Sequence, residues 1–252
     1  MTKTHKPVLA QGPALRALHP WTPTGGRARQ LLSDQERARL AAVASIVRFK
    51  KGEVIYREGD RAEAIFNVIQ GVVAAYKEDS NQSRRIFAFL LSDDLFGLSA
   101  EGKYANSTRA VSPVTVYRMS LPALRSRLPK DPQLEFHLIC KLCQELCQAQ
   151  RHAILLSQRK AIAKLAMFLQ LIEQLQFTRG ERTDEIFLPM QRSDIGEYVG
   201  MTLAAVSRAF QSLARRGIIK TQNRRYVRIV DRMQFERFAG ESPLASTIKS
   251  TA

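Results

Sequence analysis

The sequence of 252 residues lacks the features that would assign it to several large classes of protein. It has only three cysteines, an odd number, and no hydrophobic signal segment, so we expect reduced thiols and a cytoplasmic location. No apolar run approaches about 18 residues, so we expect no transmembrane helix and no membrane partner. It has four histidines and lacks a P-loop, a nucleophile elbow and paired His and Asp at metal-ligand spacing. We therefore expect neither an enzyme nor a metal site.

Basic residues, by contrast, are abundant. The 39 Lys and Arg against 23 Asp and Glu give a formal net charge of +16. This charge indicates a polyanionic partner, and nucleic acid fits better than a membrane because no isolated basic amphipathic helix is present. With 45% hydrophobic residues the chain can bury substantial cores, and its length fits two domains plus tails.

Residues 188–220 have the pattern of two short helices joined by a tight turn. Ser193 is placed to cap the first helix, Gly200 lies at the turn, and Thr202 can cap the second helix. The apolar positions of the second helix fall on one side, namely Val206, Phe210 and Leu213. This arrangement is typical of a helix-turn-helix, whose second helix enters the DNA major groove.

Three features favour DNA binding over a purely structural pair of amphipathic helices. Residues 190–240 contain 10 Lys and Arg but only 4 Asp and Glu. The polar positions come early in the second helix, where base edges are reached. A predicted β-hairpin follows, with Asn223, Arg224 and Arg225 near its tip, and it resembles the wing of a winged helix.

The residues before this region divide into several segments. Residues 1–30 hold several Pro and Gly with little periodicity and are predicted to be a disordered tail, as are residues 241–252. Ser33 can start a short helix with Glu36 completing a capping box. Residues 46–119 alternate short apolar runs with turn signals at roughly 8–12-residue spacing, which predicts a many-stranded antiparallel sheet or barrel.

A long helix is predicted from Gln133 to about Gln158, because this run contains no Gly or Pro. Apolar residues recur in it at alternating steps of three and four, which is a heptad pattern. These residues are Ile139, Leu142, Leu146, Ala149, Ala153 and Leu156. They form either a homodimer interface or the face of a single helix packed on its own domain; we favour the dimer because a palindromic DNA site needs a two-fold partner.

Taken together, residues 31–240 resemble the CRP/FNR superfamily of bacterial transcription regulators. The order LPMxRxDIGxYxG and TxxxVSRxFxxLxxxGII resembles its DNA-binding domain, and KxGExI, EGD, FxVIxG and DxFGL resemble its cyclic-nucleotide-binding β-roll. The resemblance implies an α+β fold in which a β-roll is followed by a long dimerisation helix and a winged helix-turn-helix. The corresponding limits are residues 31–130, 131–158 and 159–240.

The resemblance also implies a function. It suggests a homodimeric regulator, an activator, that binds a palindromic operator in double-stranded DNA and contacts RNA polymerase. The alternative is a module that binds a cyclic nucleotide or another small molecule, with the helical C-terminus as an accessory.

The recognition helix of the FNR-like branch carries a Glu, two intervening residues and then Ser-Arg. Ser207 and Arg208 match the Ser-Arg pair, whereas Ala204 takes the place of the Glu. Arg208 can donate two hydrogen bonds to guanine, with a phosphate clamp as the alternative, and Ser207 can contact a base edge or a thymine methyl. Ala204 cannot accept a hydrogen bond from cytosine, so its base pair should be read less strictly or by apolar contact. Phosphate contacts are expected from Arg192, Thr202, Gln211, Arg215, Arg224 and Arg225.

The roll lacks the residues that cAMP-binding members use. Their Arg-Ser pair, which neutralises the cyclic phosphate, falls near Tyr104-Ala105, with Ser107 and Arg109 as alternatives in a looser register. The helix positions that would touch the purine fall near Ala149 and Gln150, which have no hydroxyl. We therefore do not expect cAMP to bind. The roll resembles those of FixK-like regulators, several of which act without a bound small molecule or are controlled by cysteine oxidation.

The cysteines do not match those of the oxygen-sensing FNR proteins, which hold an iron–sulfur cluster through an N-terminal set and one cysteine in the roll. Neither region has a cysteine here, so we expect no such cluster. Cys140, Cys143 and Cys147 instead lie on one stripe of the long helix, about 120° from the dimer positions, and are predicted to face the roll. They are either small buried hydrophobic side chains or a redox switch. His137 and His152 lie off this stripe, which disfavours zinc.

Overall fold

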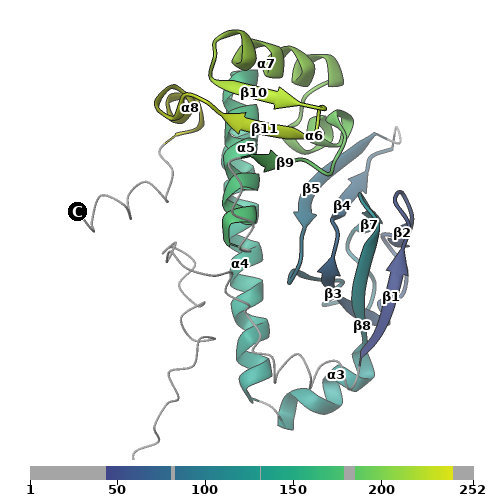
Figure 1. Ribbon diagram of the computed structural model, residues 1–252. Helices are drawn as coiled ribbons and strands as arrows, with labels where there is room; N and C mark the ends of the chain where they lie inside the picture. Colours follow the sequence, from purple (N-terminus) through teal and green to yellow (C-terminus); the bar gives the residue numbers. More distant parts are fainter. Residues whose placement is uncertain (1–43, 81–82, 131, 179–184, 241–252) are drawn as a thin grey trace, which may run out of the picture.

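The computed structural model describes the chain in four stretches (Figure 1). They are residues 44–80, 83–130, 132–178 and 185–240. The predicted tails lie outside them, and so does most of the short helix predicted from Ser33. Ala44 and Ser45 already belong to a strand, so a helix extending to residue 45 is excluded.

The N-terminal domain is a roll of two antiparallel four-stranded sheets, with strand orders β1-β8-β3-β6 and β2-β7-β4-β5. Its strands are β1 Ala44–Phe49, β2 Val54–Tyr56, β3 Ala64–Gln70, β4 Val73–Glu78, β5 Arg84–Leu90, β6 Leu95–Phe96, β7 Ser107–Ala110 and β8 Val114–Ser120. β-Branched residues supply much of the core between the sheets, since Val68, Val73 and Val116 are fully buried.

Gly71 permits the tight connection between β3 and β4. Its φ of 95° lies in the left-handed region, and a Cβ there would lie 2.3 Å from the carbonyl oxygen of Pro113. Any larger residue would push the β3–β4 turn away from the start of β8.

Helices α3 (Leu121–Arg127) and η1 (Leu128–Lys130) lead from the roll into the long helix α4 (Pro132–Ser157). Helix α4 runs alongside the roll, and α5 (Ala161–Thr178) continues from it into the C-terminal domain (Figure 1). Pro132 begins α4, as expected for the first helical turn.

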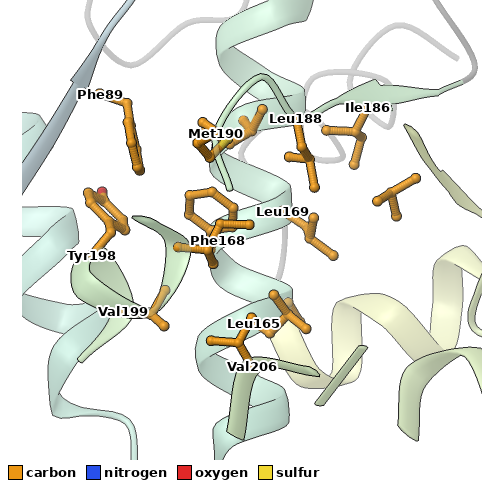
Figure 2. Close-up of a cluster of buried hydrophobic side chains, with 14 of the residues drawn as sticks. Phe89, Leu165, Phe168, Leu169, Ile186, Leu188, Met190, Tyr198, Val199 and Val206 are labelled. Atoms are coloured by element: carbon orange, nitrogen blue, oxygen red, sulfur yellow. The ribbon is translucent and has the colours of Figure 1, made fainter. Parts of the chain in front are cut away.

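The C-terminal domain contains a helix pair followed by a small sheet of order β10-β11-β9. Its elements after α5 are β9 Ile186–Phe187, α6 Arg192–Val199, α7 Leu203–Arg215, β10 Ile219–Gln222, β11 Tyr226–Ile229 and α8 Arg232–Ala239. The close-up in Figure 2 shows Leu165 and Phe168 of α5 packed with Val199 of α6 and Val206 of α7. The α+β fold predicted from the sequence is therefore confirmed: a β-roll, a long helix and a winged helix-turn-helix.

Candidate nucleic-acid interface

The first helix of the pair begins differently from the sequence-based prediction. Gln191, not Ser193, is the N-cap of α6, and Ser193 lies within the first turn. The N–H of Gln191 donates to Oδ2 of Asp194 at 2.9 Å. A carboxylate in this position also suits the positive end of the helix dipole, so Asp194 takes over the role that we had assigned to the hydroxyl.

The turn between α6 and α7 depends on two glycines and a threonine. Gly200 ends α6 with a φ of 66°, and a Cβ on Gly196 would lie 2.6 Å from the carbonyl oxygen of Met201. Thr202 caps α7 as predicted, since its Oγ1 accepts from the N–H of Ala205 at 3.2 Å. The turn is therefore short and close-packed, and the two helices are held in one fixed relation.

Helix α7 buries its apolar side and turns its polar side outward. Val206, Phe210 and Leu213 are buried. The outward residues Ala204, Arg208, Gln211 and Arg215 are all exposed. At 100° per residue these four fall within about 60° of one another. They form the outer face of α7, with Ser207, half-buried, at its edge.

Leu203 is a residue of this interface that the sequence analysis did not single out. It begins α7, and 54% of its side chain is exposed beside Ala204 and the capping Thr202. On the helical wheel Leu203 falls only about 20° from the buried Phe210, so the spacing predicts burial and its exposure could not have been inferred from the sequence.

The predicted phosphate-binding residues differ in how exposed their side chains are to solvent. Thr202, Arg224 and Arg225 are exposed, and Asn223 and Arg224 form the hairpin tip with φ values of 50° and 58°. Arg192 is half-buried, and its guanidinium carbon lies 3.1 Å from the centre of the Phe210 ring. Burial, together with the nearby Arg224, lowers the pKa of Arg192 to about 10. It remains charged at neutral pH, and it also contributes to packing between α6 and α7.

Helix α4 has the opposite arrangement from α7, with its apolar side outward. All six residues of the predicted dimer interface are exposed, and we call them the outer face of α4: Ile139, Leu142, Leu146, Ala149, Ala153 and Leu156. The side turned toward the rest of the chain instead carries Lys141, Glu145 and His152. An exposed apolar stripe on an otherwise polar helix indicates a protein–protein contact.

The prediction that the three thiols face the roll is wrong. Cys143 is exposed, and Cys140 and Cys147 are only half-buried. The inward positions of α4 are centred near His152 and Leu155, so the cysteine stripe falls on the flank of the helix. Burial, and then Cys143, raises the pKa of the Cys140 thiol, which lowers its thiolate fraction. Within the described residues no group of three or more His, Cys, Asp and Glu could hold a metal ion.

Ala149 and Gln150, the positions that the resemblance places near the purine, are both exposed in the single chain. The inward side of α4 carries a buried ionic cluster instead. Nζ of Lys141 lies 3.5 Å from Oδ1 of Asp94, and both side chains are 12% exposed. Burial and the neighbouring Asp94 raise the pKa of Glu145 to about 7, although Lys141 opposes the shift.

Aromatic side chains fill the part of the roll in which the resemblance places the ligands of a cyclic phosphate. The Tyr56 and Tyr104 rings stack with centroids 3.8 Å apart in the core, beside Phe66 and Phe96. The Tyr104 hydroxyl donates to the carbonyl oxygen of Ala64 at 2.8 Å, so it is already used. At the position that carries the phosphate-binding arginine in cAMP-binding members, this chain therefore has a buried, uncharged ring.

The two alternative phosphate ligands are also engaged elsewhere. Ser107 Oγ accepts from the N–H of Glu58 at 2.9 Å. The side chain of Arg109 extends to the C-terminal domain, where its Nη2 donates to Oδ1 of Asp194 on α6 at 2.6 Å. Both alternatives are therefore engaged within the described residues, and the inward side of α4 adds the carboxylates of Asp94 and Glu145.

These features define a class: a β-roll joined by a long helix to a winged helix-turn-helix. Comparison with protein families agrees. The model of the Cyclic nucleotide-binding domain matches residues 46–131, and that of the Crp-like helix-turn-helix domain matches residues 163–238.

Individual relatives narrow the assignment. The chain is 34% identical to the nitrogen fixation regulation protein FixK of Bradyrhizobium diazoefficiens, over 69% of this chain and 73% of that protein. It is 28% identical to the transcriptional activator protein FnrA of Stutzerimonas stutzeri, over 76% and 79%. The structure of FixK2 from Bradyrhizobium japonicum superposes with a TM-score of 0.73 at 30% identity, covering 79% of this chain and 98% of that one. The chain belongs to the CRP/FNR superfamily, in its FixK-like branch, and is a DNA-binding transcription regulator.

The comparisons name transcription regulators and indicate no enzyme family. In the four stretches that the structure covers, no helix has the length and hydropathy needed to cross a bilayer.

Proposed function

We propose that the protein acts as a homodimer that binds a palindromic operator and activates transcription in contact with RNA polymerase. The observation that carries the proposal is the outer face of α4. Leu146 is 60% exposed and Ile139 51% exposed, and such side chains are usually covered by a partner. A second copy presents the same stripe, so a two-fold contact would bury both at once. The name of the relative FnrA supports activation.

Within each half-site, Arg208 reads a guanine and Ala204 contributes an apolar contact. Arg208 is exposed near the middle of the outer face of α7, where two hydrogen bonds to guanine O6 and N7 are sterically accessible. Ser207 contacts a base edge or a thymine methyl at the edge of the same surface. Phosphate contacts come from Arg192, Thr202, Gln211, Arg215, Arg224 and Arg225.

The regulatory signal is not cAMP. The stacked rings of Tyr56 and Tyr104 and the carboxylates of Asp94 and Glu145 support this part of the proposal. Two signals are compatible with the chain: oxidation at the α4 thiols, of which Cys143 is the exposed one, and a different small molecule at the roll.

DNA selection from a random pool tests the function directly, using the purified full-length chain at fixed salt in reduced and then oxidised form. We expect an enriched palindrome with half-sites about one helical turn apart. A palindrome found only with reduced protein, and lost when the cysteines are replaced, assigns the signal to the thiols. The same palindrome in both states leaves a small molecule or no signal. Enrichment of no palindrome in either state contradicts the proposed function.

A further inference from the structure

The roll and the DNA-binding domain meet at helix α6. One continuous buried cluster runs from the outer side of the roll into the core of the C-terminal domain. The Phe89 ring of β5 lies 5.3 Å from the ring of Tyr198 on α6 and 6.2 Å from Phe168 on α5 (Figure 2). Helix α6 therefore packs directly against the roll.

A buried ion pair crosses this contact. Nη2 of Arg109 on β7 lies 2.6 Å from Oδ1 of Asp194 on α6, with 13% and 9% of the side chains exposed. Arg109 is held at its base, because β7 pairs with β2 through Val54 and with β4 through Ala74. A buried pair between two ordered elements has a narrow range of geometries, and removing one partner leaves an uncompensated charge.

Asp194 connects the pair to the recognition helix. Its second oxygen accepts from the N–H of Gln191, so one carboxylate holds both the start of α6 and the roll. From there the close contact of Gly196 with Met201 passes any tilt of α6 on to α7. The opposite end of α6 is also held, since Nε2 of His152 on α4 lies 2.7 Å from the carbonyl oxygen of Tyr198.

We propose that Arg109 is a positioning residue for DNA recognition: through Asp194 it sets the orientation of α6 and α7 relative to the roll, and hence the separation of the two recognition helices in the dimer. This inference rests on the proposed dimer and palindrome. Arg109 lies in the roll, on the β-sheet face away from the aromatic core. Through Asp194 its position directly affects the half-site spacing that the dimer prefers. This effect requires no bound ligand.

Spacing preference is the readout that separates positioning from stability. Operators obtained for the full-length wild type are rebuilt with the half-sites one base pair closer and one farther apart, and dissociation constants are measured by fluorescence anisotropy at fixed salt. A variant that merely unfolds more easily loses active protein, so its binding to all three spacings weakens by the same factor. A variant with a misplaced α6 changes the ratio between the spacings.

The variants are Arg109→Gln, Asp194→Asn, their combination and Arg109→Lys. Asp194→Asn keeps an oxygen for the Gln191 N–H, so the start of α6 is retained while the charge is lost. Lys77→Gln is the control, because it removes one charge of an exposed ion pair in the roll, between Lys77 and Glu58 at 2.8 Å, outside the contact with α6. Thermal melting checks that each protein is folded.

We expect Arg109→Gln and Asp194→Asn each to reduce the discrimination between spacings by about tenfold. The double variant should do no more than either single one, Arg109→Lys should retain most of the discrimination, and Lys77→Gln should match the wild type. The inference is overturned if the ratio of dissociation constants between the spacings is the same for Arg109→Gln as for the wild type, whether or not overall affinity falls. If the wild type itself binds no palindrome, the proposed function fails first.

Discussion

Helices α4 and α7 are both amphipathic, but they are oriented in opposite ways. Helix α7 buries Val206 and Leu213 and presents Arg208 to solvent, whereas α4 buries His152 and exposes Leu146. The difference tells which kind of partner each helix has. A basic polar surface suits a polyanion, and an apolar stripe suits another apolar stripe. In the proposed dimer the two surfaces serve one function, because the α4 contact would bring two copies of α7 onto one operator.

The largest effect is expected from a charge on the outer face of α4. Leu146→Asp would bury two carboxylates across the two-fold axis, so we expect a monomer and a loss of operator affinity of more than about a hundredfold. Analytical ultracentrifugation and anisotropy measure the two results. Ser126→Asp, which adds the same charge at an exposed position of α3, is the control and should remain dimeric. A Leu146→Asp protein that stays dimeric would show that the outer face of α4 is not the dimer contact.

The next largest effect is expected on the outer face of α7. Arg208→Ala removes the proposed contact with guanine, which is worth about 1–3 kcal/mol, or roughly ten- to a hundredfold in affinity. The loss should disappear on operators in which that guanine is replaced. Arg215→Ala should weaken all sequences alike and reduce the salt slope by about one. If both variants show the same uniform loss, Arg208 is a phosphate clamp.

A smaller effect is expected at Ala204, where a substitution should add base selectivity to the outer face of α7. Ala204→Glu supplies an acceptor for cytosine N4, so we expect a new preference for cytosine of about tenfold at one position of each half-site. The converse test uses the wild type. Replacing a thymine there with uracil removes only the C5 methyl, and we expect weaker binding if the contact is apolar. Equal binding of thymine and uracil, with no effect of the Glu, would place Ala204 outside the readout.

The smallest effect concerns the inward side of α4 and depends on pH. The pKa of Glu145 is raised to about 7 in the folded chain, from an ordinary value of 4.5. The folded state therefore keeps a proton that the unfolded state releases, so the free energy of unfolding decreases as pH rises through that window. Glu145→Gln should remove this decrease and stabilise the protein by about 1 kcal/mol at pH 8, allowing for partial solvent screening. Denaturant melts at pH 5 and pH 8 measure it. The buried His152 has a lowered pKa, which makes stability rise with pH, so the test is the difference between the two proteins. An equal pH dependence of the wild type and Glu145→Gln would contradict the prediction.

Local chemistry explains which parts of the structure could be predicted. The Gly200 turn and the Thr202 cap depend on neighbouring residues, so their positions follow from spacing alone. The first cap was misassigned because Gln191 is an uncommon N-cap, and its partner Asp194 lies three residues inside the helix. The exposure of the outer face of α4 follows from the heptad pattern. The orientation of Cys143 does not, because it depends on where the roll packs.

Long-range contacts explain most of the rest. Arg109 and Asp194 are 85 residues apart, and nothing in either local sequence pairs them. A resemblance to cAMP-binding proteins made Arg109 an alternative phosphate ligand, whereas the structure directs it to another domain. Similarly, the stacking of Tyr56 on Tyr104 joins strand β2 to the segment between β6 and β7, and only the folded sheets bring these together.

Because the proposed dimer forms through the exposed leucines of α4, operator occupancy depends on the concentration of the chain in the cell. When subunits are scarce relative to the dimer dissociation constant, the dimer concentration rises with the square of the chain concentration. A twofold change in synthesis would then change operator occupancy about fourfold. Modest changes in expression or degradation would thus change operator occupancy steeply.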